Sequence, residues 1–139
     1  MRKSVLQNAP ISDIISRMGH GDGLCLGDAG LPVPSETRRI DLAVRRNLPK
    51  MLDVAQTIGE ELQIESVLIA DELLEQQPAY HQSVLALIKD IETAQGTRID
   101  VRSVPHVDFK KATASCKAIV RTGECTPFAN VIFYAGVAF

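Results

Sequence analysis

The sequence lacks tryptophan, and only 4% of its 139 residues are aromatic. A surface on which nucleic-acid bases or polysaccharide rings stack is therefore not expected. The net charge is −2, and the basic cluster between Arg38 and Lys50 is interrupted by Asp41 and contains no aromatic residue. Both features argue against a protein that binds nucleic acid.

Cysteine is scarce, and long apolar runs are absent. The three cysteines, Cys25, Cys116 and Cys125, show no C-x-x-C spacing, so we expect neither a disulfide framework nor a metal site. The basic N-terminus is not followed by the apolar run of about 7–15 residues that a signal peptide requires. No segment approaches the roughly 18 apolar residues of a membrane span. We therefore expect a soluble, cytoplasmic protein.

Strand-like and helical segments alternate along residues 1–139 without a linker, which indicates a single domain. Apolar runs predict strands at 23–27, 39–44, 67–70, 98–104, 118–121 and in the final segment 130–137. Helical periodicity, or a proline at a helix start, predicts helices at 11–18, at 49–58, from Pro78 to just before Gly96, and after Pro105. The fold class expected is α/β: a three-layer α/β/α domain with a mostly parallel or mixed central sheet.

Two histidines stand at opposite ends of predicted helices. His20 lies between Gly19 and Gly21, just beyond the first helix, where the helix dipole favours the charged imidazolium and hence a proton donor. His106 opens a later helix, where the dipole favours a neutral ring. Two groups with different ionisation supply an acid and a base. The alternatives are an exposed loop histidine and a simple capping residue.

Asp28 follows the predicted buried strand 23–27, at the strand end where open α/β sheets bind their ligands. Its neighbours Gly27, Ala29 and Gly30 are small and leave room for a ligand. The Asp28 carboxylate could orient sugar hydroxyls or fix the ionisation of a histidine. Alternatively, it forms an Asx turn within its own loop.

Two pairs of adjacent acidic residues, Glu60–Glu61 and Asp71–Glu72, could suggest a metal site or a carboxylate dyad. Adjacent side chains on a helix diverge by about 100°. We therefore expect both pairs to lie on solvated faces.

Segments spread over the whole chain resemble the D-ribose pyranase family, which is related to the fucose mutarotases. They are Ile14–His20, Asp28–Pro34, Arg39–Ala43, Arg121–Asn130 and Ala135–Phe139. The resemblance implies interconversion of the pyranose and furanose forms of D-ribose, in support of ribose uptake and phosphorylation. It implies His20 as the proton donor. It also implies sugar contacts from Asp28, His106, Phe128, Ala129 and Asn130.

Three positions separate this chain from parts of that family. Phe128 stands where tyrosine is expected, and the missing hydroxyl could remove one hydrogen bond to the sugar. Fucose mutarotases are expected to carry arginine at the position of His106 and glycine at that of Ala129, so both residues favour the pyranase branch. The family forms ring-shaped homo-oligomers, commonly decamers, with sites near subunit boundaries, and the apolar C-terminus is compatible with such an assembly.

Ring interconversion requires an acid at the ring oxygen and a base at the anomeric hydroxyl. No redox step or carbanion arises, so no cofactor is expected. We expect His20 to be the acid, Asp28 to orient it or set its charge, and His106 and Asn130 to hold sugar hydroxyls. The base remains open between His106 and water. The alternative functions are a fucose-type anomeric mutarotase and a non-catalytic sugar-binding or regulatory protein.

Overall fold

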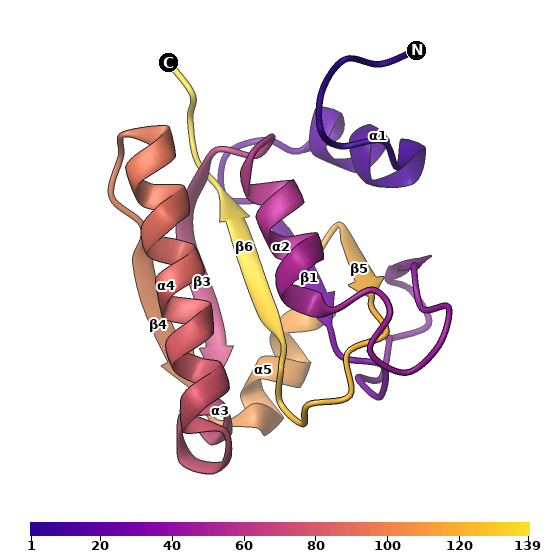
Figure 1. The fold of residues 1–139 in the computed structure, drawn as a ribbon, viewed down its shortest axis with the longest axis vertical. Coiled ribbons are helices and arrows are strands. Elements are labelled where there is room, and N and C mark those ends of the chain that lie inside the picture. The colour runs from indigo at the N-terminus through magenta and orange to yellow at the C-terminus, as the bar shows by residue number, and fades with distance from the viewer.

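The computed structural model describes residues 1–139 as one six-stranded sheet flanked by five helices (Figure 1). The strands are β1 (Gly23–Gly27), β2 (Arg38–Asp41), β3 (Ile64–Ala70), β4 (Asp100–Val104), β5 (Ala118–Arg121) and β6 (Val131–Ala135). The helices are α1 (Ala9–Arg17), α2 (Met51–Gly59), α3 (Asp71–Gln76), α4 (Pro78–Gln95) and α5 (His106–Thr113).

The sheet has the strand order β2-β5-β1-β6-β3-β4. Strands β1 to β5 all run in the same direction, and only β6, inserted between β1 and β3, is antiparallel to its neighbours. The predicted mixed α/β sheet is therefore confirmed. We call the end at which β1 to β5 finish and β6 begins the carboxyl end of the sheet, and the opposite end the amino end.

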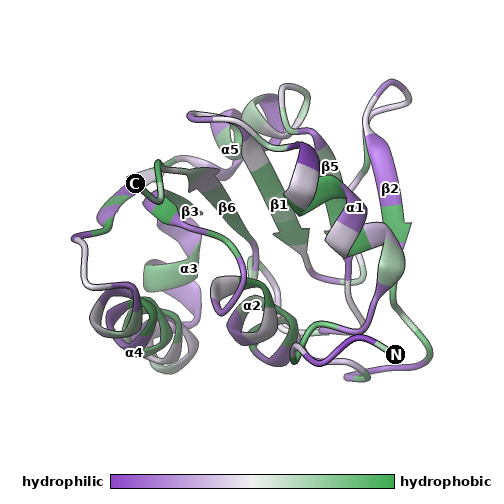
Figure 2. Ribbon diagram, turned by 90° about the horizontal axis from the view of Figure 1, so that it is seen from above, coloured by the Kyte–Doolittle hydropathy of each residue, from purple (hydrophilic) through white to green (hydrophobic).

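Helices cover both faces of the sheet, but unequally. Figure 2 shows α2 and α4 on one side and α5 on the other. The first four helices share a cluster of 24 buried apolar residues with the sheet, whereas the second cluster has only 8 residues and includes Phe109 of α5. The predicted three-layer arrangement is thus present, with one layer reduced to a single short helix.

Some element boundaries differ from the sequence prediction. The strand predicted at 39–44 ends at Asp41, because the Asp41 carboxylate accepts a hydrogen bond from the amide of Ala43 and turns the chain (3.0 Å). The helix predicted from Pro49 begins at Met51, and α3 was not predicted at all. Gly96 does cap α4 in the left-handed conformation, as expected (φ 73°).

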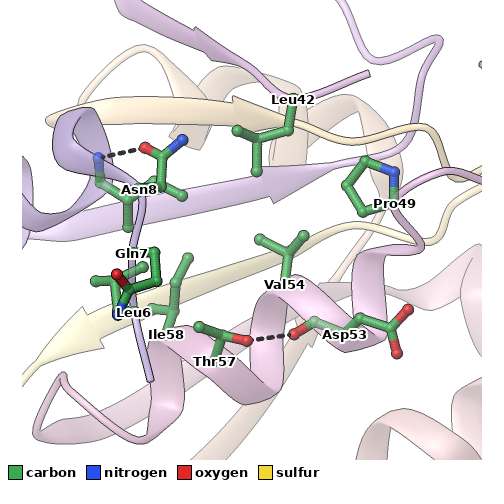
Figure 3. A pocket seen from close by; sticks show the side chains of 10 residues that line it. Leu6, Gln7, Asn8, Leu42, Pro49, Asp53, Val54, Thr57 and Ile58 are labelled. Carbon is green, nitrogen blue, oxygen red and sulfur yellow. Dashed lines mark hydrogen bonds between the residues drawn. The ribbon is translucent and has the colours of Figure 1, made fainter. Parts of the chain in front are cut away.

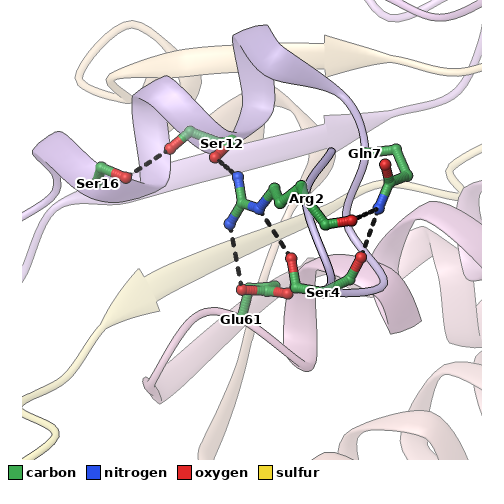
Figure 4. A network of polar contacts seen from close by, with 6 residues as sticks. All are labelled: Arg2, Ser4, Gln7, Ser12, Ser16 and Glu61. Carbon is green, nitrogen blue, oxygen red and sulfur yellow. Dashed lines mark hydrogen bonds and ion pairs between the residues drawn. The ribbon is translucent and has the colours of Figure 1, made fainter.

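The N-terminal segment is tied to two helices by one side chain (Figure 4). The Arg2 guanidinium donates to the hydroxyl of Ser4 at 2.8 Å and to that of Ser12 in α1. It also pairs with Glu61, just beyond α2, at 3.6 Å. Exposed pairs of this kind add little stability, so their consequence is mainly to fix where the chain enters α1.

Candidate functional site

Asp28 and Asn130 form a reciprocal pair at the carboxyl end of the sheet. The Asp28 amide donates to Asn130 Oδ1 at 2.7 Å, and Asn130 Nδ2 donates to Asp28 Oδ2 at 3.0 Å. The pairing follows from the register, since β1 ends and β6 begins at this level. Asp28 Oδ1 accepts from the amide of Gly30 at 2.8 Å, so the Asx turn is also present. The turn and the asparagine together fix a half-buried carboxylate at the carboxyl end of the sheet.

His106 and Phe128 meet beside this pair. Their ring centroids lie 5.0 Å apart and their planes are perpendicular, while Phe109 stacks against His106 at 6.2 Å. Phe128 adopts a φ of 63°, which is unfavourable for a residue with a large side chain. Such strain persists only where the surroundings enforce it, and it clusters at functional sites. His106 Nε2 is buried and has no hydrogen-bond partner, so it is an unused polar atom.

The predicted site residues at this end therefore come together from two strand ends and one helix start. Asp28 follows β1, His106 opens α5 after β4, and Phe128, Ala129 and Asn130 precede β6. The side chain of Ala129 is fully buried, so it shapes the site without offering a polar atom.

Glu124 and Tyr80, which the sequence did not single out, hold the loop that leads to Phe128. Glu124 is buried, and its carboxylate accepts hydrogen bonds from the amide of Thr126 at 3.0 Å and the hydroxyl of Tyr80 at 2.8 Å. Burial raises the pKa of Glu124, but these hydrogen bonds outweigh burial and leave the pKa below its ordinary value. Burial, followed by the hydrogen bond to the Glu124 carboxylate, raises the pKa of Tyr80, so its hydroxyl keeps its proton and donates. The result is a fixed loop ahead of Phe128.

Glu72 corrects the expectation that both acidic pairs are merely solvated. Its carboxylate accepts a hydrogen bond from the backbone amide of His106 at 2.8 Å. An anionic acceptor at the first residue of a helix satisfies an otherwise unpaired amide. Glu72 thereby links α3 to α5 and holds the position of the histidine.

His20 lies at the amino end of the sheet, away from Asp28. The two residues are separated by the whole of β1, whose 5 residues at roughly 3.3 Å each span about 16 Å. Within one chain, therefore, Asp28 does not orient His20 as the sequence led us to expect. The His20 Nε2 atom instead lies 2.7 Å from Glu65 Oε2.

One cavity elsewhere on the molecule carries no comparable chemistry. An apolar cavity of about 260 Å³ lies between the N-terminal segment, α2 and the chain after β2 (Figure 3). Asp53 is its only titratable lining residue, so it offers no acid/base pair. No three His, Cys, Asp or Glu side chains are grouped so that they could hold a metal ion. None of the helices combines the length and apolar character needed to cross a membrane.

Polar and aromatic side chains lie together at the carboxyl end of the sheet. A carboxylate, an amide and an imidazole converge there beside an aromatic ring, as in sites that orient small polar ligands. The model of the RbsD / FucU transport protein family matches residues 1–138, and the chain belongs to this family. The resemblance found in the sequence is thereby confirmed.

Individual relatives extend over the whole chain. The D-ribose pyranases of Pectobacterium carotovorum subsp. carotovorum (strain PC1) and Yersinia pestis (strain Pestoides F) are 45% and 44% identical to it over 139 residues, covering 100% of both chains in each case. Bacillus subtilis RbsD complexed with D-ribose has a TM-score of 0.91 at 34% identity and covers 100% of both chains. The fucose mutarotase of Streptococcus pneumoniae in complex with L-fucose shares the fold, with a TM-score of 0.71 at 22% identity over 94% of this chain and 93% of its own.

Proposed function

We propose that this protein is an isomerase that interconverts the pyranose and furanose forms of D-ribose by acid/base catalysis. The observation that carries the proposal is the Asp28–Asn130 pair beside His106, in a chain 45% identical over its full length to a D-ribose pyranase. The activity would support ribose uptake and phosphorylation in the cytoplasm.

The proposed roles follow from the chemistry of each side chain. His20 protonates the ring oxygen as the bond between that oxygen and the anomeric carbon breaks. Asp28 and Asn130 hold sugar hydroxyls through groups already fixed by their mutual hydrogen bonds. His106 offers its unpaired Nε2 to a further hydroxyl, and the ring of Phe128 contacts an apolar face of the sugar. Water or His106 accepts the proton of the anomeric hydroxyl, so no cofactor takes part.

A complete site requires two copies of the chain, because His20 and Asp28 lie at opposite ends of β1. We propose a homo-oligomer, a decamer as in the family it resembles, in which the amino end of one sheet faces the carboxyl end of another. The His20 side chain is 63% exposed in the single chain, so it is accessible for contact with a neighbouring copy.

Magnetisation-transfer NMR on equilibrated D-ribose tests the activity directly. Faster exchange between pyranose and furanose signals in the presence of the protein is the expected result. Faster exchange of anomers alone, or with fucose and not ribose, would instead identify a mutarotase. Saturable ribose binding without any faster exchange would identify a sugar-binding protein.

A mixing experiment tests the two-copy site. His20→Ala and Asp28→Asn are each expected to be inactive as pure oligomers. In randomly mixed oligomers about one quarter of the sites combine an intact His20 with an intact Asp28 from different chains. Activity that returns to about that fraction of wild type supports the shared site. Mixed oligomers without activity contradict it.

A further inference from the structure

Glu65 is the only side chain that contacts His20 through a hydrogen bond, although 45 residues separate them in the sequence. The distance between His20 Nε2 and Glu65 Oε2 is 2.7 Å. Glu65 lies at the irregularity where the pairing of β3 with β6 shifts register between Ile64 and Ser66. A bulge of this kind re-aims a side chain, and here the re-aimed side chain is a carboxylate.

The backbone around both residues is held in place. The amide of Gly21 (φ 80°) donates to the carbonyl of Ala135 at the end of β6 (2.8 Å), so the turn that carries His20 is attached to the sheet. Asp22 accepts from the amide of Gly19 at 2.9 Å and pairs with Lys117 at 3.2 Å. The Gly19 hydrogen bond, followed by the Lys117 charge, lowers the pKa of Asp22, so this anchor remains ionised.

The C-terminal segment runs close against Glu65. A Cβ atom at Gly136 would lie 3.1 Å from the Cβ of Glu65, and the Gly136 amide donates to the carbonyl of Gln63 at 2.8 Å. A larger residue at position 136 would push Glu65 aside. The fold thus leaves Glu65 the space in which it reaches His20.

We propose that Glu65 is the positioning residue of His20 in the ring interconversion. This inference rests on the proposed function. An ionised carboxylate only accepts hydrogen bonds, so Glu65 keeps the proton on Nε2 in the neutral ring. In the charged imidazolium Nδ1 carries the second proton. It gives this proton to the sugar ring oxygen, which leaves the neutral ring with its proton on Nε2, and it is later reprotonated from water. A carboxylate that fixes the tautomer and orientation of a histidine has the same role in the Ser-His-Asp triad.

The contact between Glu65 and His20 should affect the rate of catalysis rather than the stability of the fold. The side chains of His20 and Glu65 are 63% and 45% exposed, and ion pairs this accessible contribute little to folding. Loss of the carboxylate should therefore leave the free energy of unfolding of the chain nearly unchanged. It should lower the rate, because a freely rotating imidazole presents Nδ1 to the substrate only part of the time.

Kinetics of Glu65→Ala and Glu65→Asp give the first test. We expect Glu65→Ala to lower kcat for ribose ring exchange by about 10- to 100-fold with KM within about twofold, as loss of orientation removes part of an acid/base contribution of ~10²–10⁴. Glu65→Asp keeps the charge and should recover part of that loss. Glu60→Gln, at a carboxylate without a side-chain partner near the same end, is the matched control and should behave as wild type. Unchanged kcat in Glu65→Ala, or a loss confined to KM, overturns the proposal.

The double variant separates a positioning role from a direct one. If Glu65 acts only through His20, adding Glu65→Ala to His20→Ala produces no further loss, because residues that act as a unit are not additive. A further loss means that Glu65 touches the substrate itself and contradicts the proposal.

A spectroscopic test does not depend on activity, so it distinguishes failure of this inference from failure of the proposed function. At about pH 9, where imidazole is ordinarily neutral, long-range ¹H–¹⁵N spectra report which ring nitrogen carries the proton. We expect His20 to be protonated at Nε2 alone in wild type and in Glu65→Asp, and to become a mixture of tautomers in Glu65→Ala. Identical His20 nitrogen shifts in all three proteins overturn the assignment, even if ribose exchange is catalysed.

Discussion

The two ends of the sheet are built in different ways. At the carboxyl end, Asn130 is fully buried, Glu124 is 3% exposed, and each is satisfied by several hydrogen bonds. At the amino end, His20 and Glu65 are 63% and 45% exposed and have mainly one another. The polar groups of Asn130 and Glu124 are paired within a single chain, whereas His20 is left exposed to the surroundings.

Under the proposed function, this difference separates the residues that bind the sugar from the residue that donates the proton. Buried, satisfied polar groups are rigid and costly to disturb, so they suit the recognition of sugar hydroxyls. An exposed histidine is free to exchange protons and costs the fold little, so it suits a proton donor supplied to a neighbouring copy. Substitutions at the carboxyl end should therefore alter stability and activity together, and those at the amino end activity alone.

The largest effect is expected for His20→Ala. Ring exchange should fall by ~10²–10⁴ because the proton donor is lost. The free energy of unfolding should stay within about 0.5 kcal/mol, since the side chain is largely exposed. Magnetisation-transfer NMR and urea denaturation measure the two quantities, with His81→Ala as a histidine control. Retained exchange would remove His20 from the mechanism.

Asn130→Ala should reduce both stability and activity. The substitution leaves the half-buried Asp28 amide unpaired and removes a donor from the Asp28 carboxylate, at a combined cost of about 2–4 kcal/mol in the free energy of unfolding. Asn8→Ala is a useful control, because Asn8 caps α1 through the amide of Ile11 (3.0 Å) and its loss should cost about 1 kcal/mol with exchange intact. Equal costs for the two variants, measured by urea denaturation, would contradict the contrast between the ends.

Glu124→Gln should change the pH dependence of stability. The folded pKa of Glu124 lies below the ordinary 4.5, so its ionised form stabilises the protein above about pH 4.5. This contribution is lost as the pH falls through the lower, folded pKa. The stability advantage of wild type over the variant should therefore be greatest near neutral pH and shrink on acidification. Urea titrations at several pH values measure it, and a gap independent of pH would show that the charge of Glu124 is not involved.

Phe128→Tyr should have the smallest effect. The new hydroxyl adds at most one hydrogen bond to the sugar, worth about 0.5–1.5 kcal/mol, which corresponds to a decrease of about 2- to 10-fold in KM for ribose. Steady-state exchange measurements over a range of ribose concentrations give KM. An unchanged KM would mean that the ring at position 128 meets the sugar only through apolar contact.

Elements with strong local patterns could be predicted from the sequence. The bounds of β1 and β5 agree with the apolar runs 23–27 and 118–121, and α4 runs from Pro78 to just before Gly96 as its periodicity and cap predict. By contrast, the helix 71–76 is too short to show helical periodicity. The strand was predicted to extend to residue 44 because residues 42–44 are apolar, but these residues follow the turn at Asp41 and lie outside β2. Prediction failed where a turn or a tertiary contact outweighed local preference.

The candidate site divides in the same way. Asp28 and His106 were indicated by their places after a strand and at a helix start, whereas Phe128, Ala129 and Asn130 were indicated only by the family resemblance. Glu65, Tyr80 and Glu124 gave no local signal, and Glu72 stood out only as one of an adjacent acidic pair expected to be solvated. Each of these four acts through a partner at least 34 residues away in the sequence, and no periodicity encodes such contacts.

The sequence by itself determined the α/β class, most of the strands and the residue types available for acid/base chemistry, because hydrophobic period, proline and glycine act over a few neighbouring residues. Only the tertiary structure decided that β6 enters the sheet antiparallel between β1 and β3, that His20 faces Glu65, and that Asp28 faces Asn130 at the opposite end. Strand order and the pairing of buried polar groups depend on contacts between distant segments, and these acquire their free energy only when the whole sheet assembles.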